Sequence, residues 1–568
     1  MATVVLQTIG AAVGQFLGGP IGAAIGQTAG AIAGATIDQR LFGPKPSDGS
    51  RLSTMPALAS TEGAPVPIVF GRARVGGQVI WATRFEEQGG RQSGKSVRSS
   101  TPKNYQYFAN FAVGLCEGEI AGVRRIWADG NEIDQTKISI RVYRGTEDQA
   151  PDALIVAKEG SQNAPAYRGL SYVVFERMPL ADFGNRIPQL SFEVVRPTNG
   201  VASLVQGVDI IPGAGEFVYS DKRTMVLEGF AGGRPANVNT LVASSDWTAS
   251  LDALEQSCPN VSSTALVVSW FGDDLRAGNC TIAPRVDNSI KQTIGATWSV
   301  AGLFRAAARV ASEADGRAAY GGTPSDASVT EAIQDLRARG LSVVFYPFVM
   351  MDIPADNSLA DPWSTSAGQP AYPWRGRLTC NPAPDRAGSP DGTSGAATQV
   401  ATFFGSTLPS ANEWSFRRFI LHYANLCANA GGVDAFIIGS ELVSLTRVRG
   451  APGHYPAVSA LVQLAADVKA ILGPGCKVSY AADWTEYGAH VRDGGAEVRF
   501  PLDQLWASPS IDFIGIDFYP PLSDWRDGDN HLDARIAPSI YSVDYLRAGV
   551  ASGEAFDWYY RDTKPNAD

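Results

Sequence analysis

From about residue 240 onward, apolar runs of strand length alternate with helical patterns, and this rhythm limits the possible folds more than any other feature of the chain. Such alternation is typical of βα units, in which a helix connects each strand to the next parallel one. The runs are almost continuously apolar, as in a parallel sheet that is covered on both faces. We therefore predict an α/β domain over residues 241–568, with strands at 265–271, 318–320, 341–351, 434–438, 478–482 and 511–516.

Carboxylates or aromatic residues follow five of these six predicted strands. A (β/α)₈ barrel assembles its site at the carboxyl ends of its strands, so we expect a TIM-barrel-like domain. About six strands are present, and strands seven and eight would fall outside this sequence. A doubly wound open sheet is the alternative fold. No GxGxxG pattern follows a first strand, so nucleotide binding has no support.

The candidate site residues are carboxylates and aromatics at these strand ends. Glu441 follows the predicted fourth strand and is the candidate catalytic acid, while Asp483, Glu486 and Asp517 are the carboxylates that would oppose it. Aromatic rings can stack on the C–H faces of sugars. A glutamate at a strand end is often a cap or an ion-pair partner, and tryptophan is often a core residue, so both interpretations stand. The candidate aromatics are Trp484, Tyr519 and Trp525, with Trp270, Trp374 and Trp506 as further possibilities.

The first 37 residues carry no charged side chain, and glycine recurs at every fourth position within them. If residues 1–43 are helical, these glycines form one stripe against which another helix can pack closely. Each glycine costs a helix roughly 1 kcal/mol relative to alanine, so we expect this helix to form only beside a partner or in lipid. A membrane-active segment, a plug helix inside an assembly, and a buried or disordered leader remain open. The stripe comprises Gly10, Gly14, Gly18, Gly22, Gly26, Gly30 and Gly34.

Residues 44–60 are rich in proline and serine and are predicted to be a linker, and residues 61–200 are predicted to form a β-rich domain. A polar, glycine-rich stretch at 86–104 is interpreted as a solvated hairpin loop or as a flexible arm that touches a neighbouring subunit or passing DNA. Residues 201–240 would connect the two domains. The strands predicted in the β-rich domain are 66–70, 75–82, 105–115, 120–128, 138–143, 171–175 and 189–195.

Charge and cysteine usage exclude several classes of function. The formal net charge is −10, whereas a general nucleic-acid coat needs a cationic surface. The six cysteines are scattered without a CxxC pair, and the four histidines show no HExxH-type spacing. We therefore expect no metal site and no cofactor.

Seven blocks of the sequence resemble known tail proteins. The segments 65–81, 111–130 and 165–194 resemble tail hub and tip proteins of long-tailed phages. The segments 320–354, 434–450, 480–487 and 511–525 resemble the glycoside-hydrolase TIM-barrel-like domain of gene transfer agent tail proteins, which are phage-derived. Together they make the chain similar to the large tail-tip ("megatron", or baseplate hub and host-specificity) proteins of these agents. Members of that family are much longer than this chain.

The resemblance implies a structural component of the tail tip or baseplate of a virion-like particle, made in the bacterial cytoplasm. Such a protein would close the tail channel and take part in host-envelope contact and DNA delivery. Its expected partners are two further copies in a homotrimer, other tail hub or baseplate proteins, the DNA in the channel, and the envelope membrane or surface polysaccharide. The glycine stripes of the three copies would meet on one axis.

The resemblance leaves the enzymatic activity of the barrel uncertain. Retaining glycosidases place an acid/base glutamate after strand four, commonly preceded by asparagine, and a nucleophilic glutamate after strand seven. Glu441 is preceded by Ser440, and strand seven falls outside this sequence. One alternative is a tail-associated hydrolase that acts on surface polysaccharide or peptidoglycan, with Glu441 as acid/base. The other is a glycan-binding adhesin without catalysis.

Overall fold

The computed structural model describes residues 63, 65–89, 105–213, 215–229, 232–519, 522–523 and 525–552. The predicted glycine-striped helix, the predicted linker and most of the polar stretch at 86–104 lie outside the described residues. The chain divides into two compact units, Met1–Arg196 and Pro197–Asp568.

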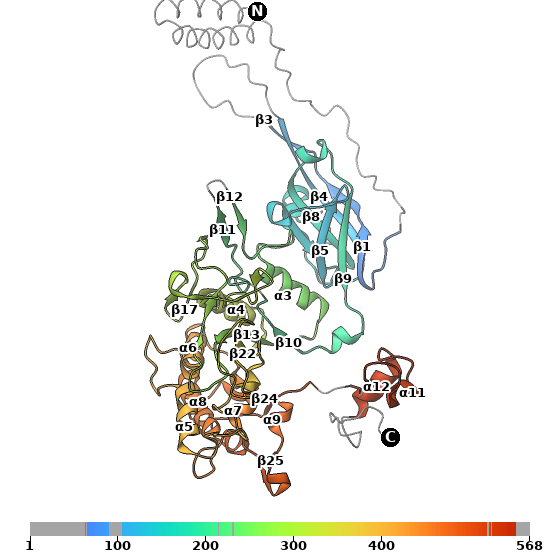
Figure 1. Cartoon of the computed structure of the whole chain (residues 1–568). Helices are drawn as coiled ribbons and strands as arrows, with labels where there is room; N and C mark the ends of the chain where they lie inside the picture. Colours follow the sequence, from blue (N-terminus) through green and yellow to red (C-terminus); the bar gives the residue numbers. More distant parts are fainter. Residues whose placement is uncertain are drawn as a thin grey trace, which may run out of the picture. The chain divides into compact units, whose positions relative to one another are not determined.

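The first unit is β-rich and contains two antiparallel sheets (Figure 1). In one sheet the order is β1 (Gly71–Gly76), β9 (Leu190–Arg196), β5 (Gly122–Ala128) and β6 (Asn131–Glu132). In the other it is β2 (Gln78–Ala82), β4 (Tyr105–Glu117), β8 (Leu170–Pro179) and β7 (Ser139–Tyr143), with β3 (Glu86–Gly89) also paired to β4.

The core of this unit lies between the two sheets. Phe111 of β4 stacks on Phe175 of β8 with ring centroids 4.8 Å apart, and Phe175 in turn meets Phe192 of the opposite sheet at 6.3 Å. Alternate residues of the same two strands point the other way, where Tyr172 and Val174 pack with Ile155 of helix α2 (Ala153–Glu159). Both faces of β4 and β8 are therefore buried, which explains their long apolar runs.

The predicted strand at 75–82 is divided at Gly77, where the chain passes from one sheet to the other. A Cβ atom at Gly77 would lie 2.1 Å from Val113 Cγ1, so only glycine fits this corner. The predicted strand at 66–70 is wrong, because this segment is extended but the first strand begins at Gly71. The other five predicted strands are confirmed with shifts of a few residues at their ends.

The second unit contains a six-stranded parallel path, which makes it a TIM-like half-barrel. The strand order is β10 (Gly207–Ile210), β13 (Ser263–Gly272), β22 (Ser342–Met351), β23 (Ala435–Ser440), β24 (Lys477–Asp483) and β27 (Gly515–Asp517), and β14 (Ile282–Ala283) pairs antiparallel with β13. The main helices are α3 (Asp246–Ser257), α4 (Asp326–Ala338), α5 (Ser394–Phe404), α6 (Phe416–Asn429) and α8 (Pro456–Leu472).

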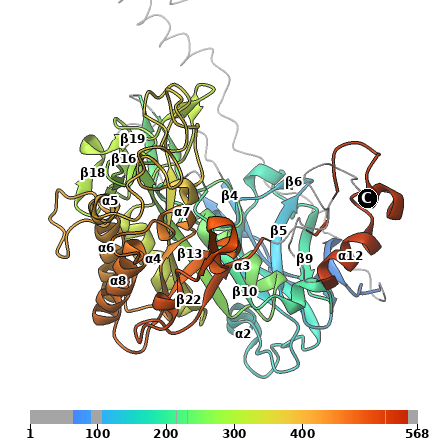
Figure 2. The same cartoon turned by 60° about the horizontal axis from the view of Figure 1, so that its bottom comes forward.

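Strand β22 shows how the half-barrel is layered. Its side chains alternate between fully buried and half-buried along the whole strand. The buried set, which includes Val343 and Phe345, packs beneath the helices in the large core of this unit. The half-buried set, which includes Tyr346 and Phe348, faces the other side of the sheet. Figure 2 shows α4, α6 and α8 on one flank of the sheet.

The sequence prediction identified the right number of parallel strands but not the right set. The prediction at 318–320 is wrong, because β21 (Arg317–Ala318) pairs only with β20 (Glu313–Ala314) in a small hairpin. The missed strand is β10, whose four residues are too short to show a buried apolar run. The two errors compensate, so β23 is still the fourth strand along the chain and Glu441 still follows it.

Shorter elements fill the connections of the second unit. They are β11 (Met225–Glu228), β12 (Gly232–Pro235), β15 (Arg285–Val286), β16 (Thr293–Ile294), β17 (Ser299–Val300), β18 (Leu303–Phe304), β19 (Arg309–Val310), α7 (Val443–Thr446), α9 (Trp484–Tyr487), β25 (His490–Arg492), β26 (Glu497–Arg499), α10 (Asp503–Trp506), α11 (Leu532–Ile536) and α12 (Val543–Ser552). Among the described residues, no helix is both long enough and apolar enough to cross a bilayer.

Candidate functional site

Glu441 lies directly beyond the end of β23, in a strained piece of backbone. The pairing of β23 with β24 is irregular between Ile437 and Ser440, and Gly439 adopts a φ of +149°. Glu441 itself has a φ of +51°, a left-handed conformation that is uncommon for a residue with a side chain. Its backbone N–H donates to the Ala481 carbonyl at 2.9 Å. Strain of this kind gathers at functional sites, where the surrounding structure enforces it.

The Glu441 carboxylate is buried and is held by two donors from the loop that follows β22. The indole Nε1 of Trp374 donates to Oε2 at 2.6 Å, and the Arg375 Nη2 atom lies 2.8 Å from the same oxygen. Only 7% of Glu441 is exposed. The carboxylate is therefore fixed in one direction, and its negative charge is matched by a neighbouring guanidinium.

Arg375 is in turn fixed by the strand that precedes Glu441. Its Nε donates to the Ser440 carbonyl and its Nη2 to the Ser440 hydroxyl, both at 3.0 Å. Its guanidinium carbon lies 3.6 Å from the centroid of the Phe348 ring, a cation–π contact. The serine that replaces the asparagine of the glycosidase pattern thus helps to hold the arginine that pairs with Glu441.

Asp517, at the end of β27, completes a carboxyl pair with Glu441. The Tyr346 hydroxyl donates to Asp517 Oδ2 at 2.6 Å, and the Asp517 carboxyl lies near that of Glu441. Burial raises the pKa of Asp517 to about 7; the adjacent Glu441 also raises it, and the hydrogen bond from Tyr346 acts in the opposite direction. Asp517 therefore keeps its proton to a higher pH than an ordinary aspartate does.

The structure places Asp483 beside Asp517 but gives it a local role. The two residues are register partners on β24 and β27. The Asp483 side chain accepts from the Thr485 N–H at 2.9 Å and caps the short helix α9, while the Glu486 side chain accepts from the Asp483 N–H at 3.2 Å. This reciprocal capping box occupies the Asp483 carboxylate.

Glu486 lies beneath the site and connects to Glu441 through one tyrosine. The Tyr480 hydroxyl donates to Glu486 Oε1 at 3.0 Å and accepts from the Leu442 N–H at 2.7 Å. Thr446 donates to the same carboxyl oxygen at 2.7 Å. Burial raises the pKa of Glu486 to about 7, although these hydrogen bonds lower it. Glu486 and Tyr480 therefore fix the peptide that follows Glu441.

The candidate aromatics are dispersed. Trp374 is 42% exposed beside Glu441 and Tyr519 is 73% exposed just after β27, so both can offer a ring face to a ligand. Trp484 is half-buried in α9. Trp525 packs edge-on against His531 at 4.7 Å and near Tyr545. The prediction is wrong for Trp270, which is fully buried and donates to the Tyr423 hydroxyl in the core. Trp506 packs near Tyr480.

Sequence reasoning missed Arg375 and Tyr346. Arg375 lies in a long connection, far from any strand end, so its position along the chain gave no signal. Tyr346 is in the middle of an apolar run, where the alternation of faces along β22 was the available signal. Groups of three or more histidine, cysteine or acidic side chains arranged to hold a metal ion are absent from the described residues.

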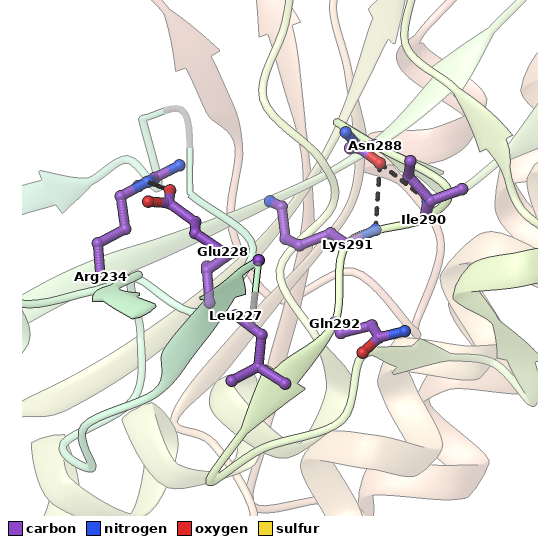
Figure 3. Close-up of a pocket in the computed structure, with 9 residues that line it drawn as sticks. Leu227, Glu228, Arg234, Asn288, Ile290, Lys291 and Gln292 are labelled. Atoms are coloured by element: carbon purple, nitrogen blue, oxygen red, sulfur yellow. Dashed lines mark hydrogen bonds and ion pairs between the residues drawn. The ribbon is translucent and has the colours of Figure 1, made fainter. Parts of the chain in front are cut away.

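A pocket of about 670 Å³ lies elsewhere in the second unit, between the β11–β12 hairpin and the loop at 288–292 (Figure 3). Most of its polar side chains are paired within the protein. Glu228 pairs with Arg234 at 2.7 Å, and Asn288 accepts from the Lys291 N–H at 3.1 Å. Lys291 is paired with Glu216 and Asp287. Buried, converging polar groups occur instead around Glu441, so we place the candidate site there.

The arrangement at Glu441 combines a buried carboxylate, paired with Arg375, and a neighbouring carboxyl group, Asp517, whose pKa is raised. In a retaining glycosidase two carboxyl groups stand about 5–5.5 Å apart, with the sugar carbon between them. Among the described residues, Asp517 is the candidate proton donor of this site, and Glu441 is the buried hydrogen-bond acceptor beside it.

Comparison with known proteins identifies the domain. Residues 414–568 match the family described as the GTA TIM-barrel-like domain, where GTA denotes gene transfer agent. A chain of the virion of a native gene transfer agent particle is 42% identical over 33% of this chain and 40% of that chain, with a TM-score of 0.21. The GH113 β-mannanase AaManA from Alicyclobacillus acidocaldarius is 16% identical over 51% of this chain and 57% of that chain, with a TM-score of 0.24.

This chain spans less than two thirds of the length of either of these solved structures. A search of curated proteins gives no match. The family match covers β23, β24 and β27, and so includes Glu441, directly after β23, and Asp517, on β27. It supports the resemblance drawn from the sequence: residues 414–568 contain a gene transfer agent TIM-barrel-like domain.

Proposed function

We propose that this protein is a structural component of the tail tip of a gene transfer agent particle. It would close the tail channel and contact the host envelope during DNA delivery, as part of a homotrimer with other hub or baseplate proteins around it. The observation that carries this proposal is the match of residues 414–568 to the TIM-barrel-like domain of gene transfer agents. The phage-like blocks at 65–81, 111–130 and 165–194 support it.

The experiment that tests this role locates the chain in the particle. An epitope-tagged chain is expressed in a producing strain that lacks its own copy, and purified particles are labelled with gold-conjugated antibody. We expect label at the tail tip only. Label along the whole tail, or none on intact particles, contradicts the proposal.

The same strain tests the glycine stripe, which lies outside the described residues. We expect Gly26→Leu to leave the number of particles unchanged and to reduce DNA transfer at least tenfold, because a leucine blocks close helix approach. Ala24→Leu, off the stripe, is the matched control and should transfer DNA normally. Equal transfer by the two variants counts against a packed glycine helix.

The half-barrel would contribute envelope contact by binding glycan at the Glu441 site. Trp374 and Tyr519 offer exposed ring faces, which suit the C–H faces of sugars. Glu441 offers a hydrogen-bond acceptor, and the neighbouring Asp517, whose pKa is raised to about 7, offers a proton.

Hydrolysis is the second candidate, and one observation favours it: the pKa of Asp517 is raised to about 7, which suits a general acid. The two candidates differ in their products. With the full chain and soluble peptidoglycan fragments, we expect binding that survives Glu441→Gln within a few-fold, and no new reducing ends. Reducing ends that wild type releases and Glu441→Gln does not would establish the hydrolase instead.

A further inference from the structure

A second group of charged side chains lies outside the Glu441 site, on loops that follow the carboxyl ends of β22, β23 and β24. Arg447 and Arg449 come directly after α7, and His490 and Arg492 belong to β25. We call these four residues the arginine cluster. Their acidic neighbours come from the loop after β22, in Asp385 and Asp391, and from β26, in Glu497.

The three carboxylates near the arginine cluster are either shared between arginines or exposed to solvent. Asp391 is shared, because it accepts from Arg449 Nη2 at 2.9 Å and lies 3.4 Å from Arg492 Nη1. Glu497 lies 3.8 Å from Arg449 but only 2.8 Å from the exposed Arg499. Asp385, 3.2 Å from Arg492, is 80% exposed, so water screens that ion pair.

Arg447 has no ion pair among the described residues. Its Nη2 donates to the Thr485 carbonyl at 2.8 Å. Its Nε atom is buried without a hydrogen-bond partner, and so is the Nε atom of Arg492. Buried guanidinium nitrogens usually have an acceptor, and since the described residues supply none to these two Nε atoms, water or an anion can take that place.

His490 reports the local electrostatic field. Burial lowers its pKa first, and Arg447, Arg492 and Arg449 lower it further, whereas Asp391 acts in the opposite direction. The Tyr455 hydroxyl lies 3.3 Å from His490 Nδ1 and is the neutral group that faces it. Three guanidinium groups therefore act together on this one position, and the field there favours an anion.

We propose that the arginine cluster binds an oxyanion group, a carboxylate or a phosphate, of an acidic envelope polysaccharide. Guanidinium groups present paired N–H donors that match both oxyanions. Arg447 lies six residues after Glu441, and all the contributing loops leave the same edge of the sheet as the Glu441 site. The inference rests on the proposed glycan contact and adds that the glycan is acidic.

The test is equilibrium binding of the full chain to three polymers: polygalacturonate, a phosphomannan and neutral glucomannan. We expect one of the acidic polymers to bind at least tenfold more tightly than glucomannan in low salt, and 0.5 M NaCl to abolish that preference. Carboxylate and phosphate are distinguished by which acidic polymer is preferred. Arg447→Gln and Arg492→Gln should each weaken acidic-polymer binding about tenfold and leave glucomannan binding unchanged.

Arg499→Gln is the matched control, since Arg499 is on the same hairpin but pairs with Glu497 at the surface, and it should bind within twofold of wild type. Arg447→Lys keeps the charge and should recover part of the affinity, which separates loss of charge from loss of fold. Equal binding of acidic and neutral polymers, or equal effects of Arg447→Gln and Arg499→Gln, overturns the inference. Neither outcome changes where the gold label lies on the particle. A failed polymer-binding test can therefore be told apart from a failure of the tail-tip role.

Discussion

At the scale of single residues, the candidate site is organised around one buried ion pair and two acidic groups that share its surroundings. Arg375 contacts both Glu441 and Ser440, and Asp517, whose pKa Glu441 helps to raise, accepts a hydrogen bond from Tyr346. Below them, Glu486 holds Tyr480, which receives the N–H of Leu442. These contacts fix the Glu441 carboxylate. They also hold the residue in a backbone conformation that it would not adopt alone.

The buried Glu486 predicts a pH dependence of stability. Its pKa is raised to about 7 in the folded chain from 4.5, so the folded state holds a proton that the unfolded state releases. The contribution of Glu486 to the free energy of unfolding should therefore be greatest below about pH 4.5 and be lost as the pH rises to 7, by on the order of 3 kcal/mol. Glu486→Gln should remove this loss, as measured by urea unfolding followed by tryptophan fluorescence at pH 5 and pH 8.

Glu413→Gln provides the control. Burial raises the pKa of Glu413, but hydrogen bonds from Ser406 and Ser415 lower it more, so it lies below its ordinary value and the group stays ionised from pH 5 to 8. Glu413→Gln should therefore leave the change in the free energy of unfolding between pH 5 and pH 8 the same as in wild type. If the free energy of unfolding of Glu486→Gln changed with pH as much as that of wild type, the buried carboxyl would not titrate as the structure implies.

At the scale of elements, the end of β23 decides where the Glu441 carboxylate points. Gly439 takes a φ of +149°, and a Cβ there would lie 2.8 Å from Cζ of Phe416 in helix α6. The strand can therefore turn its last residues only because glycine leaves room for the helix. This one position therefore links the packing of helix α6 to the direction in which the Glu441 carboxylate points.

Gly439→Ala should lower the free energy of unfolding by about 2–3 kcal/mol, because it adds a side chain in a left-handed conformation and forces it against the core. Thermal unfolding and glycan binding of the full chain measure the effect, and binding should weaken in parallel. Gly475→Ala, at a position with open space and no positive φ, should change stability by less than 0.5 kcal/mol. Equal stability of the two variants would contradict the role given to Gly439.

The rhythm of apolar runs was sufficient to predict most elements but not their partners. The strands at β13, β22, β23 and β24 and the helices α4, α6 and α8 follow directly from length and periodicity. The hairpin residues at 318–320 resemble a short strand in composition, and only their pairing shows that they lie outside the sheet. Gly77 likewise marks a change of sheet inside what reads as one strand.

At the scale of the whole molecule, two units with separate cores share one chain. The antiparallel unit buries both faces of its central strands, and the parallel unit buries one face beneath helices and keeps polar and aromatic side chains on the other. The second contains residues 414–568, which match the gene transfer agent TIM-barrel-like domain. A delivery role would use both units, which is why the proposed experiments keep the full chain.

By itself the sequence determined the two kinds of sheet and the presence of Glu441 and Asp517 at strand ends, because apolar periodicity and local order along the chain fix these. Only the tertiary structure decided that Arg375, from a distant loop, pairs with Glu441, that Tyr346 bonds to Asp517, and that Asp483 serves as a cap. Such contacts depend on which strands become neighbours and on how each loop returns, and neither leaves a periodic signal in the chain.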